Sequence, residues 1–305
     1  MPSWNELVGE MSRIPNPQQG GAWLQTKQSE WLKKLSVKRG DRNVLFYGSA
    51  FLQKPQVASI LLQISPEDIN GYMSTMYGMD WTKGLTLILH TPGGVTNATE
   101  TIVEYLHQKF TDIEVIVPTY AMSAGTMISL AANRIVMGRQ SQLGPIDPQM
   151  PGSGRMMSAR AIVDQFDRAR EEITADRGQA AVWASVLQSL GPALLTEARN
   201  ALDYGEKMVE RWLTRRRFVN DPDAVTKAQN TASYFNRSEK HKSHGRRIDR
   251  DEARSQNLDV EDLEVDQELQ DIVLTNYHIG TLIFEKSPCV KFLASSHGQA
   301  WIKNI

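Results

Sequence analysis

A serine flanked by small residues offers the most distinctive chemistry in this sequence. Ser123 lies in the segment 121–126, after an apolar stretch of strand length (113–117) and before a small-residue helical stretch (127–132). A serine at such a strand-to-helix turn holds its hydroxyl clear of the backbone, beside helix N–H groups that can stabilise an oxyanion. The pattern suits a nucleophile, but this short motif by itself favours a serine that serves only as a helix N-cap.

A pair of glycines upstream favours the nucleophile. The apolar run 85–89 leads into the sequence Thr-Pro-Gly-Gly (91–94), and an amphipathic helix is expected over 96–110. Two glycines let a backbone approach a ligand with its N–H groups exposed, whereas a lone Pro-Gly-Gly is more often a plain tight turn. Parallel strands of a strand–helix–strand unit end on the same sheet edge. We therefore expect this turn to lie beside Ser123, where open α/β sheets bind ligands.

The elements that must position these turns alternate between strands and helices. Strands are expected at 43–48, 85–89, 113–117 and 134–137, and the intervening helices at 65–79, 96–110 and 124–132. The alternation indicates an α/β fold with a largely parallel sheet. We expect residues 1–42 to form an N-terminal helical arm, with helices at 6–13 and 22–35 around a break at 15–21. Residues 43–305 are expected to form one domain with a loop at 138–155 and a helical insertion at about 158–235. Further helices are expected at 158–175, 180–190, 192–217, from 221, 249–256 and 266–285.

Composition narrows the classes of function. The chain has 305 residues and a net charge of −1, so no global charge attracts it to nucleic acid or acidic membranes. The basic run 237–250 is interpreted as a solvated loop rather than a nucleic-acid site. Cys289 is the only cysteine and is expected to be an incidental thiol. The sequence shows no secretory leader and no apolar window long enough for a membrane span, which predicts a cytoplasmic protein.

The two turns and the segments after them resemble the Clp-protease/crotonase fold. Within it, the likeness is to signal-peptide-peptidase-A-like serine peptidases, specifically the serine dehydrogenase proteinase family. It rests on T-P-G-G (91–94), A-M-S-A-G-T (121–126), S-L-A-A-N-R-I-V-M-G (129–138) and L-G-P-I-D-P-Q (143–149). The segment 243–260 resembles a later family segment, with Asn257 where relatives usually have glycine. The resemblance implies a spiral of ββα units with extra C-terminal helices, a peptide or protein substrate, a homo-oligomer, and no cofactor or metal.

The resemblance also implies roles for single residues. Ser123 corresponds to the nucleophile, and the backbone N–H groups of Gly93, Gly94 and Ala124 to the oxyanion hole. The stretch around Asp147 would lie beside the active site and help to hold an extended substrate. Equally, Asp147 could cap local backbone in a turn that Pro145 and Pro148 make rigid.

The base that would serve Ser123 is less evident. Clp-type enzymes use a histidine about twenty-five residues after the serine, but this chain has none between His107 and His241. Signal-peptide-peptidase-like enzymes use a buried lysine, and none lies between Lys109 and Lys207. Lys207, beside an apolar helical stripe, is the first candidate, although for any single lysine a surface position paired with an acid, here Asp203 or Glu210, is favoured. The alternative base is His244, in a Ser-His-Gly turn; the weaker candidates are His241 and His90.

A second class of function stays open. The same fold carries crotonase-type acyl-CoA enzymes and non-catalytic scaffolds, and fold alone does not establish function. Ser123 argues against acyl-CoA chemistry, which needs an oxyanion hole but no serine at this turn. The sequence has no pyridoxal-phosphate or iron–sulfur motif, so serine degradation, which the family name suggests, is not expected. The leading prediction is a serine endopeptidase.

Overall fold

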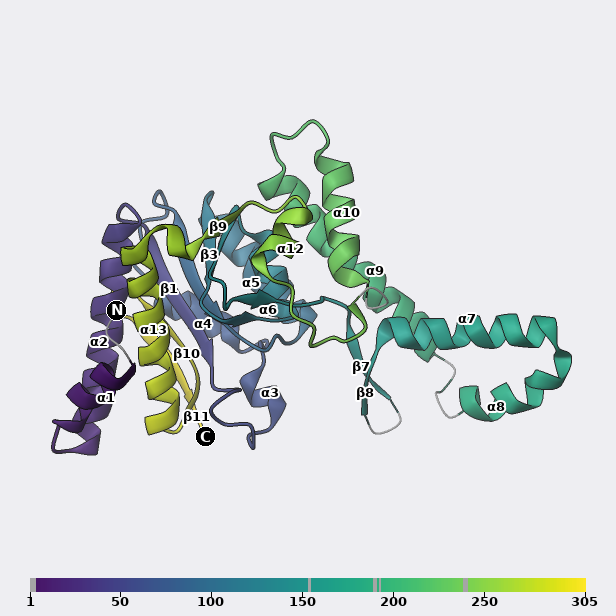
Figure 1. Cartoon of the computed structure of the whole chain (residues 1–305), viewed down its shortest axis with the longest axis horizontal. Coiled ribbons are helices and arrows are strands. Elements are labelled where there is room, and N and C mark those ends of the chain that lie inside the picture. The colour runs from purple at the N-terminus through teal and green to yellow at the C-terminus, as the bar shows by residue number, and fades with distance from the viewer. Residues whose placement is uncertain (1–3, 153–154, 189–190, 192, 238–240) are drawn as a thin grey trace. The chain divides into compact units, whose positions relative to one another are not determined.

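The computed structural model describes residues 4–152, 155–188, 191, 193–237 and 241–305 (Figure 1). The expected helix end at 190, the helix start at 192 and part of the basic run (238–240) lie outside the described residues. The chain divides into two compact units. Unit 1 comprises residues 1–143 and 247–305, and unit 2 comprises residues 144–246.

A seven-stranded sheet forms the centre of unit 1. Its strands lie in the order β11-β10-β1-β2-β3-β5-β9. The run from β1 to β9 is parallel, whereas β10 lies antiparallel between β1 and β11. The strands are β1 (Asn43–Ser49), β2 (Leu85–His90), β3 (Ile113–Val117), β5 (Arg134–Met137), β9 (Val260–Asp262), β10 (Cys289–Ser295) and β11 (Ala300–Asn304). The predicted α/β class and its four strands are confirmed, while β9, β10 and β11 were not predicted.

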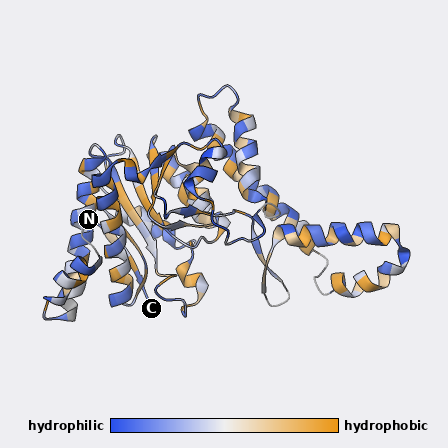
Figure 2. Ribbon diagram, viewed as in Figure 1, coloured by the Kyte–Doolittle hydropathy of each residue, from blue (hydrophilic) through white to orange (hydrophobic). Residues whose placement is uncertain are grey.

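Helices cover this sheet because its central strands are buried apolar runs that need cover on both faces. The helices α2 (Pro17–Lys38) and α13 (Gln267–Lys286) pack against one another. Elsewhere α4 (Asp68–Thr75), α5 (Thr96–Lys109) and α6 (Ala124–Ala131) form a second packed group. Figure 2 shows the sheet strands mainly in the hydrophobic colour and much of the surface of α2 in the hydrophilic one. The shorter elements of unit 1 are α1 (Trp4–Ser12), α3 (Ser59–Leu62), β4 (Tyr120–Ala121), β6 (Gln142–Leu143) and α12 (Arg250–Ser255).

The N-terminal helices join the core of unit 1. Leu24, Leu32 and Leu35 of α2 are buried in the same apolar cluster as Phe46 of β1. The expected break at 15–21 is shorter than predicted, because α2 already begins at Pro17, a residue well suited to the first helical position. The helix expected over 65–79 is also shorter than predicted, since α4 runs over Asp68–Thr75.

Unit 2 is mainly helical. Helix α7 (Ala159–Ala175) packs against α9 (Leu194–Trp212) through apolar side chains that include Ile162 and Leu202. The other elements are β7 (Gln149–Gly152), β8 (Arg155–Ser158), α8 (Ala180–Gln188) and α10 (Ala224–Asn236). The region expected to be a loop, 138–155, instead contains β6 and the start of the β7–β8 hairpin. The insertion expected at 158–235 falls inside unit 2.

A buried carboxylate links the arm to the sheet in unit 1. Glu114 on β3 has a fully buried side chain. It accepts hydrogen bonds from Arg39 Nε at 3.1 Å, Arg134 Nε at 3.1 Å and Thr86 Oγ1 at 3.0 Å. A buried charge is tolerated only when it is paired in this way. In the described part of the chain, no helix combines the length and apolarity needed to cross a bilayer.

We predict that Glu114→Gln lowers the free energy of unfolding by about 2 kcal/mol, because a neutral amide cannot replace the charge-assisted hydrogen bonds that the buried carboxylate accepts from Arg39 and Arg134. Urea denaturation followed by circular dichroism measures this change. The control is Glu30→Gln, which removes the exposed ion pair with Lys27 and should cost less than about 1 kcal/mol. Equal effects of the two substitutions would contradict a structural role for Glu114.

Candidate active site

The two predicted turns meet in unit 1, as the sequence indicated. The N–H of Thr91 donates to the carbonyl of Tyr120 at 2.9 Å, and the N–H of Met122 donates to the carbonyl of Thr91 at 3.1 Å. These bonds form a parallel bridge between Thr91 and Ala121. The turn after β2 is therefore joined by backbone hydrogen bonds to the turn before α6.

The two glycines are required for different reasons. Gly93 has a φ of +106°, and a Cβ added there would lie 2.7 Å from Cβ of Ser123. Gly94 needs space, because a Cβ there would lie 2.3 Å from the carbonyl oxygen of Ile64. Real Cβ atoms do not approach so closely, so the contact with Ser123 depends on Gly93 and the contact with Ile64 depends on Gly94. Ser123 thus lies directly against Gly93.

Ser123 has the strained backbone expected of a nucleophile turn. Its φ is 50° and its ψ is −112°, and it precedes the first residue of α6. Its side chain makes no capping hydrogen bond to that helix, so the N-cap interpretation is wrong. The residue is partly exposed. Positive φ in a residue other than glycine costs free energy and clusters at functional sites, and a strained serine turn is the geometry of a nucleophile elbow.

Two amides beside Ser123 are free to bind an oxyanion. In the described part of the chain, the N–H groups of Gly94 and Ala124 have no hydrogen-bond acceptor. Ala124 is the first residue of α6, where N–H groups lack an acceptor within the helix. The N–H of Gly93 differs, because it donates to Thr91 Oγ1 at 3.2 Å. Gly93 therefore shapes the turn, and Gly94 and Ala124 offer the available donors.

Lys207 has an environment opposite to that of a lysine base. It lies on α9 with its side chain 69% exposed, and its Nζ contacts Asp203 Oδ2 at 2.8 Å. The hydrogen bond to Asp203 raises the pKa of Lys207, whereas a lysine base needs burial that lowers it. The neighbouring Met208 and Val209 are buried. The apolar stripe was correctly predicted, but Lys207 points to solvent beside it.

His244 and Asp147 form a pair within unit 2. Nδ1 of His244 lies 2.8 Å from Oδ1 of Asp147. Asp147 is fully buried, and its Oδ2 accepts a hydrogen bond from Gln149 Nε2 at 2.9 Å. In the described residues Nε2 of His244 has no partner, and the side chain is 30% exposed. A buried carboxylate that orients one imidazole nitrogen and leaves the other available is the arrangement of a general base.

The remaining candidate side chains, those of His241, His90 and Cys289, are held by contacts within the fold or are buried in it. Both ring nitrogens of His241 are engaged, by the carbonyl of Tyr234 and by Arg246 Nη1. His90 is buried with Nδ1 3.0 Å from Thr119 Oγ1, and burial lowers its pKa to about 3. Burial raises the pKa of Cys289 to about 12, as expected for an inert thiol.

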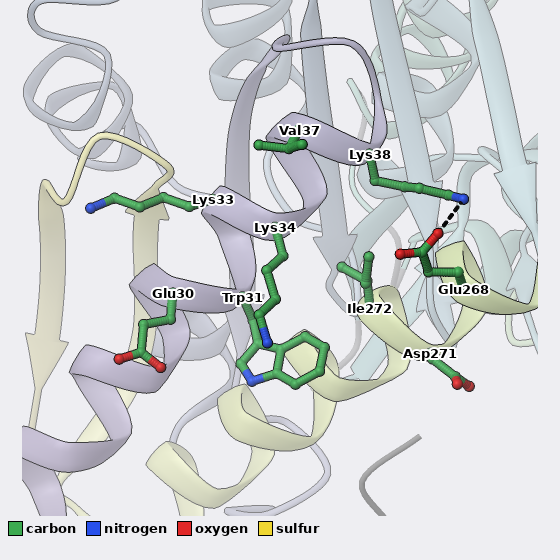
Figure 3. A pocket seen from close by; sticks show the side chains of 9 residues that line it. All are labelled: Glu30, Trp31, Lys33, Lys34, Val37, Lys38, Glu268, Asp271 and Ile272. Carbon is green, nitrogen blue, oxygen red and sulfur yellow. Dashed lines mark hydrogen bonds and ion pairs between the residues drawn. The ribbon is translucent and has the colours of Figure 1, made fainter.

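A pocket elsewhere in unit 1 does not contain Ser123. It lies between α2 and α13 and has a volume of about 890 Å³ (Figure 3). Lys34 covers the ring of Trp31 there, and Lys38 is bound to Glu268 and Asp266. No group of three or more possible metal-ligating side chains occurs in the described parts of the chain.

The sequence named Asp147 and His244 separately but did not pair them. They are 97 positions apart, and no local spacing joins them. The buried ion pair between Lys291 and Asp68 was not predicted from the sequence either, because the two residues lie far apart in the chain.

Comparisons with known proteins found one matching family and several similar proteins. Residues 16–187, more than half of the chain, match the family described as ClpP-like SDH-type serine proteinase. Two proteins of Methanocaldococcus jannaschii are similar: uncharacterized protein MJ0137, 33% identical over 54% of this chain, and uncharacterized protein MJ1495, 30% identical over 48% of it. The matches span 58% and 49% of those relatives. A mutant of the 1510-N membrane-bound stomatin-specific protease matches with 19% identity and a TM-score of 0.31, over 54% of this chain and 66% of that one.

We predict that Gly93→Ala destabilises the protein more than Gly78→Ala does. Both glycines have positive φ, but a Cβ at Gly78 meets nothing within 4 Å. The strain of positive φ alone costs about 1 kcal/mol, and the clash with Ser123 adds about 1–3 kcal/mol. Urea unfolding of the two variants measures the difference. Equal losses would contradict the contact between Gly93 and Ser123.

Proposed function

Because the chain belongs to the ClpP-like SDH-type serine proteinase family, we propose that it hydrolyses peptide bonds with Ser123 as the nucleophile. One observation carries the proposal. A strained, partly exposed serine lies against a glycine turn, with two N–H groups free beside it. This combination serves acyl transfer, which needs a nucleophile and donors for the oxyanion.

The proposed reaction begins with attack of Ser123 Oγ on the scissile carbonyl carbon. The carbonyl oxygen becomes an oxyanion and accepts hydrogen bonds from the N–H groups of Gly94 and Ala124. The hydroxyl proton passes to a base, which returns it to the leaving amine as the tetrahedral intermediate collapses. Water then hydrolyses the acyl-enzyme by the same steps. Gly93 contributes by keeping the turn close to Ser123.

We propose His244, oriented by Asp147, as this base in preference to Lys207. The supporting contact is the one between His244 Nδ1 and the buried Asp147 carboxylate, which leaves Nε2 for the serine hydroxyl.

The proposed substrate is an extended peptide or protein segment. A peptide can add to exposed backbone beside Gly94, where Val95 is 41% exposed. We further propose that the protein acts as a homo-oligomer, as the Clp-type architecture implies, and in the cytoplasm. No cofactor enters the proposed reaction.

Ser123→Ala should abolish labelling by a fluorophosphonate probe and cleavage of casein. The expected loss is at least about 1,000-fold, because this group forms the covalent intermediate. Gel fluorescence and peptide release measure the two effects. Ser74→Ala is the matched control, since Ser74 is exposed and its hydroxyl donates to the carbonyl of Gly71 at 3.1 Å. Labelling that persists in Ser123→Ala removes the peptidase assignment, and an unlabelled wild type favours a non-catalytic scaffold.

The base is identified by comparing His244→Ala with Lys207→Ala. We expect His244→Ala to lower the rate of casein cleavage by at least about 1,000-fold and Asp147→Asn to lower it by about 10,000-fold, through the wrong imidazole tautomer. Lys207→Ala should retain wild-type activity, because it removes only an exposed ion pair. Loss of activity in Lys207→Ala, with His244→Ala still active, would return the role to the lysine.

A further inference from the structure

A buried ion pair in unit 1 lies next to residues 63–65, which contact the glycine turn (residues 91–94). Lys291 on β10 and Asp68, the first residue of α4, both have fully buried side chains, and Lys291 Nζ is 2.5 Å from Asp68 Oδ1. Burial lowers the pKa of Lys291. A buried ion pair is weak support for stability, because desolvation costs as much as the attraction returns. The contacts of this pair therefore suggest another purpose.

The pair binds the segment on either side of Ile64. Lys291 Nζ donates to the carbonyl of Gln63 at 2.8 Å and to Ser65 Oγ at 3.3 Å. Asp68 accepts from the backbone N–H of Ser65 at 3.1 Å and from its hydroxyl at 3.2 Å. The hydroxyl of Tyr47 donates to the same carboxylate at 2.7 Å. Residues 63 and 65 are thus tied to a group buried in the fold.

Ile64, between these tethers, bonds directly to the glycine turn. Its N–H donates to the carbonyl of Gly93 at 2.8 Å, and its carbonyl accepts from the N–H of Val95 at 2.9 Å. The two bonds make a parallel bridge between Ile64 and Gly94. In a parallel ladder a residue bonded on both sides of its partner leaves that partner's own N–H directed away. The N–H of Gly94 therefore points away from Ile64.

We infer that Lys291 and Asp68 are positioning residues that aim the N–H of Gly94 through Ile64. The ion pair holds residues 63–65, and Ile64 holds the carbonyl of Gly93 and the N–H of Val95. Gly94 lies between those two bonds, and its lack of Cβ lets Ile64 come close. The inference rests on the proposed function, because it assigns the aimed amide to the oxyanion of the reaction at Ser123.

The test uses Lys291→Met and the double variant Lys291→Met/Asp68→Leu. Apolar replacement of a whole buried ion pair is often neutral for stability, so the double variant separates positioning from folding. Two quantities are measured in the full chain: hydrogen exchange at the amide of Val95, and the rate constant and half-saturation concentration of labelling by a fluorophosphonate. The control is Glu114→Gln, which removes a buried charge at β3 without touching residues 63–65.

We expect both Lys291 variants to exchange the Val95 amide at least about tenfold faster, since about 1.4 kcal/mol of protection corresponds to that factor. The labelling rate constant should fall about 100-fold, the cost of a misplaced group, with little change in half-saturation. Glu114→Gln should match wild type in the rate constant and the half-saturation concentration of labelling, because it lowers stability without touching residues 63–65.

Unchanged Val95 exchange and labelling in the double variant would overturn the positioning role. Failure of the proposed function is distinguishable from this outcome. If wild type is not labelled at Ser123, the peptidase assignment fails, while faster Val95 exchange in the variants still demonstrates the tether.

Discussion

Two backbone hydrogen bonds hold the two turns of the candidate site together. The N–H of Thr91 donates one of them, and the carbonyl of Thr91 accepts the other. These bonds join the end of β2 to the residues before Ser123. The turns come so close that a Cβ at position 93 would clash with Ser123. The strained φ of Ser123 is maintained because its segment is fixed on both sides. The bonds to Thr91 hold residues 120 and 122, and α6 begins directly after Ser123. Strain of this kind persists only where the surrounding structure over-determines it.

Buried charges reinforce the sheet in two distinct regions of unit 1. Near the starts of β2 and β3, Glu114 pairs with the guanidinium groups of Arg39, which directly follows α2, and of Arg134 on β5. Lys291 and Asp68 bind residues 63 and 65, beside the glycine turn that follows the other end of β2. Both groups are costly to bury, and both are fully supplied with partners. The first stabilises the fold, whereas the second bears on the direction of a single amide.

Much of the candidate site around Ser123 could be predicted from local patterns. Strand, turn and helix signals around Ser123 and Gly93–Gly94 lie within short windows, and parallel strands bring their ends to one edge. The base could not be predicted in that way. Lys207 borders an apolar stripe, but a helix places adjacent positions 100° apart, and its side chain faces solvent next to Asp203. The pairing of His244 with Asp147 spans 97 positions, beyond any local rule.

The sequence by itself determined the alternating α/β order, the family resemblance and the two turns, because each is encoded by residues close together in the chain. Only the tertiary structure decided which amides are free, that Thr91 occupies the N–H of Gly93, and that Lys291 reaches residues 63 and 65. Those outcomes depend on contacts between distant segments. Hydrogen-bond directions and burial set them, and neither is a property of residue type or spacing.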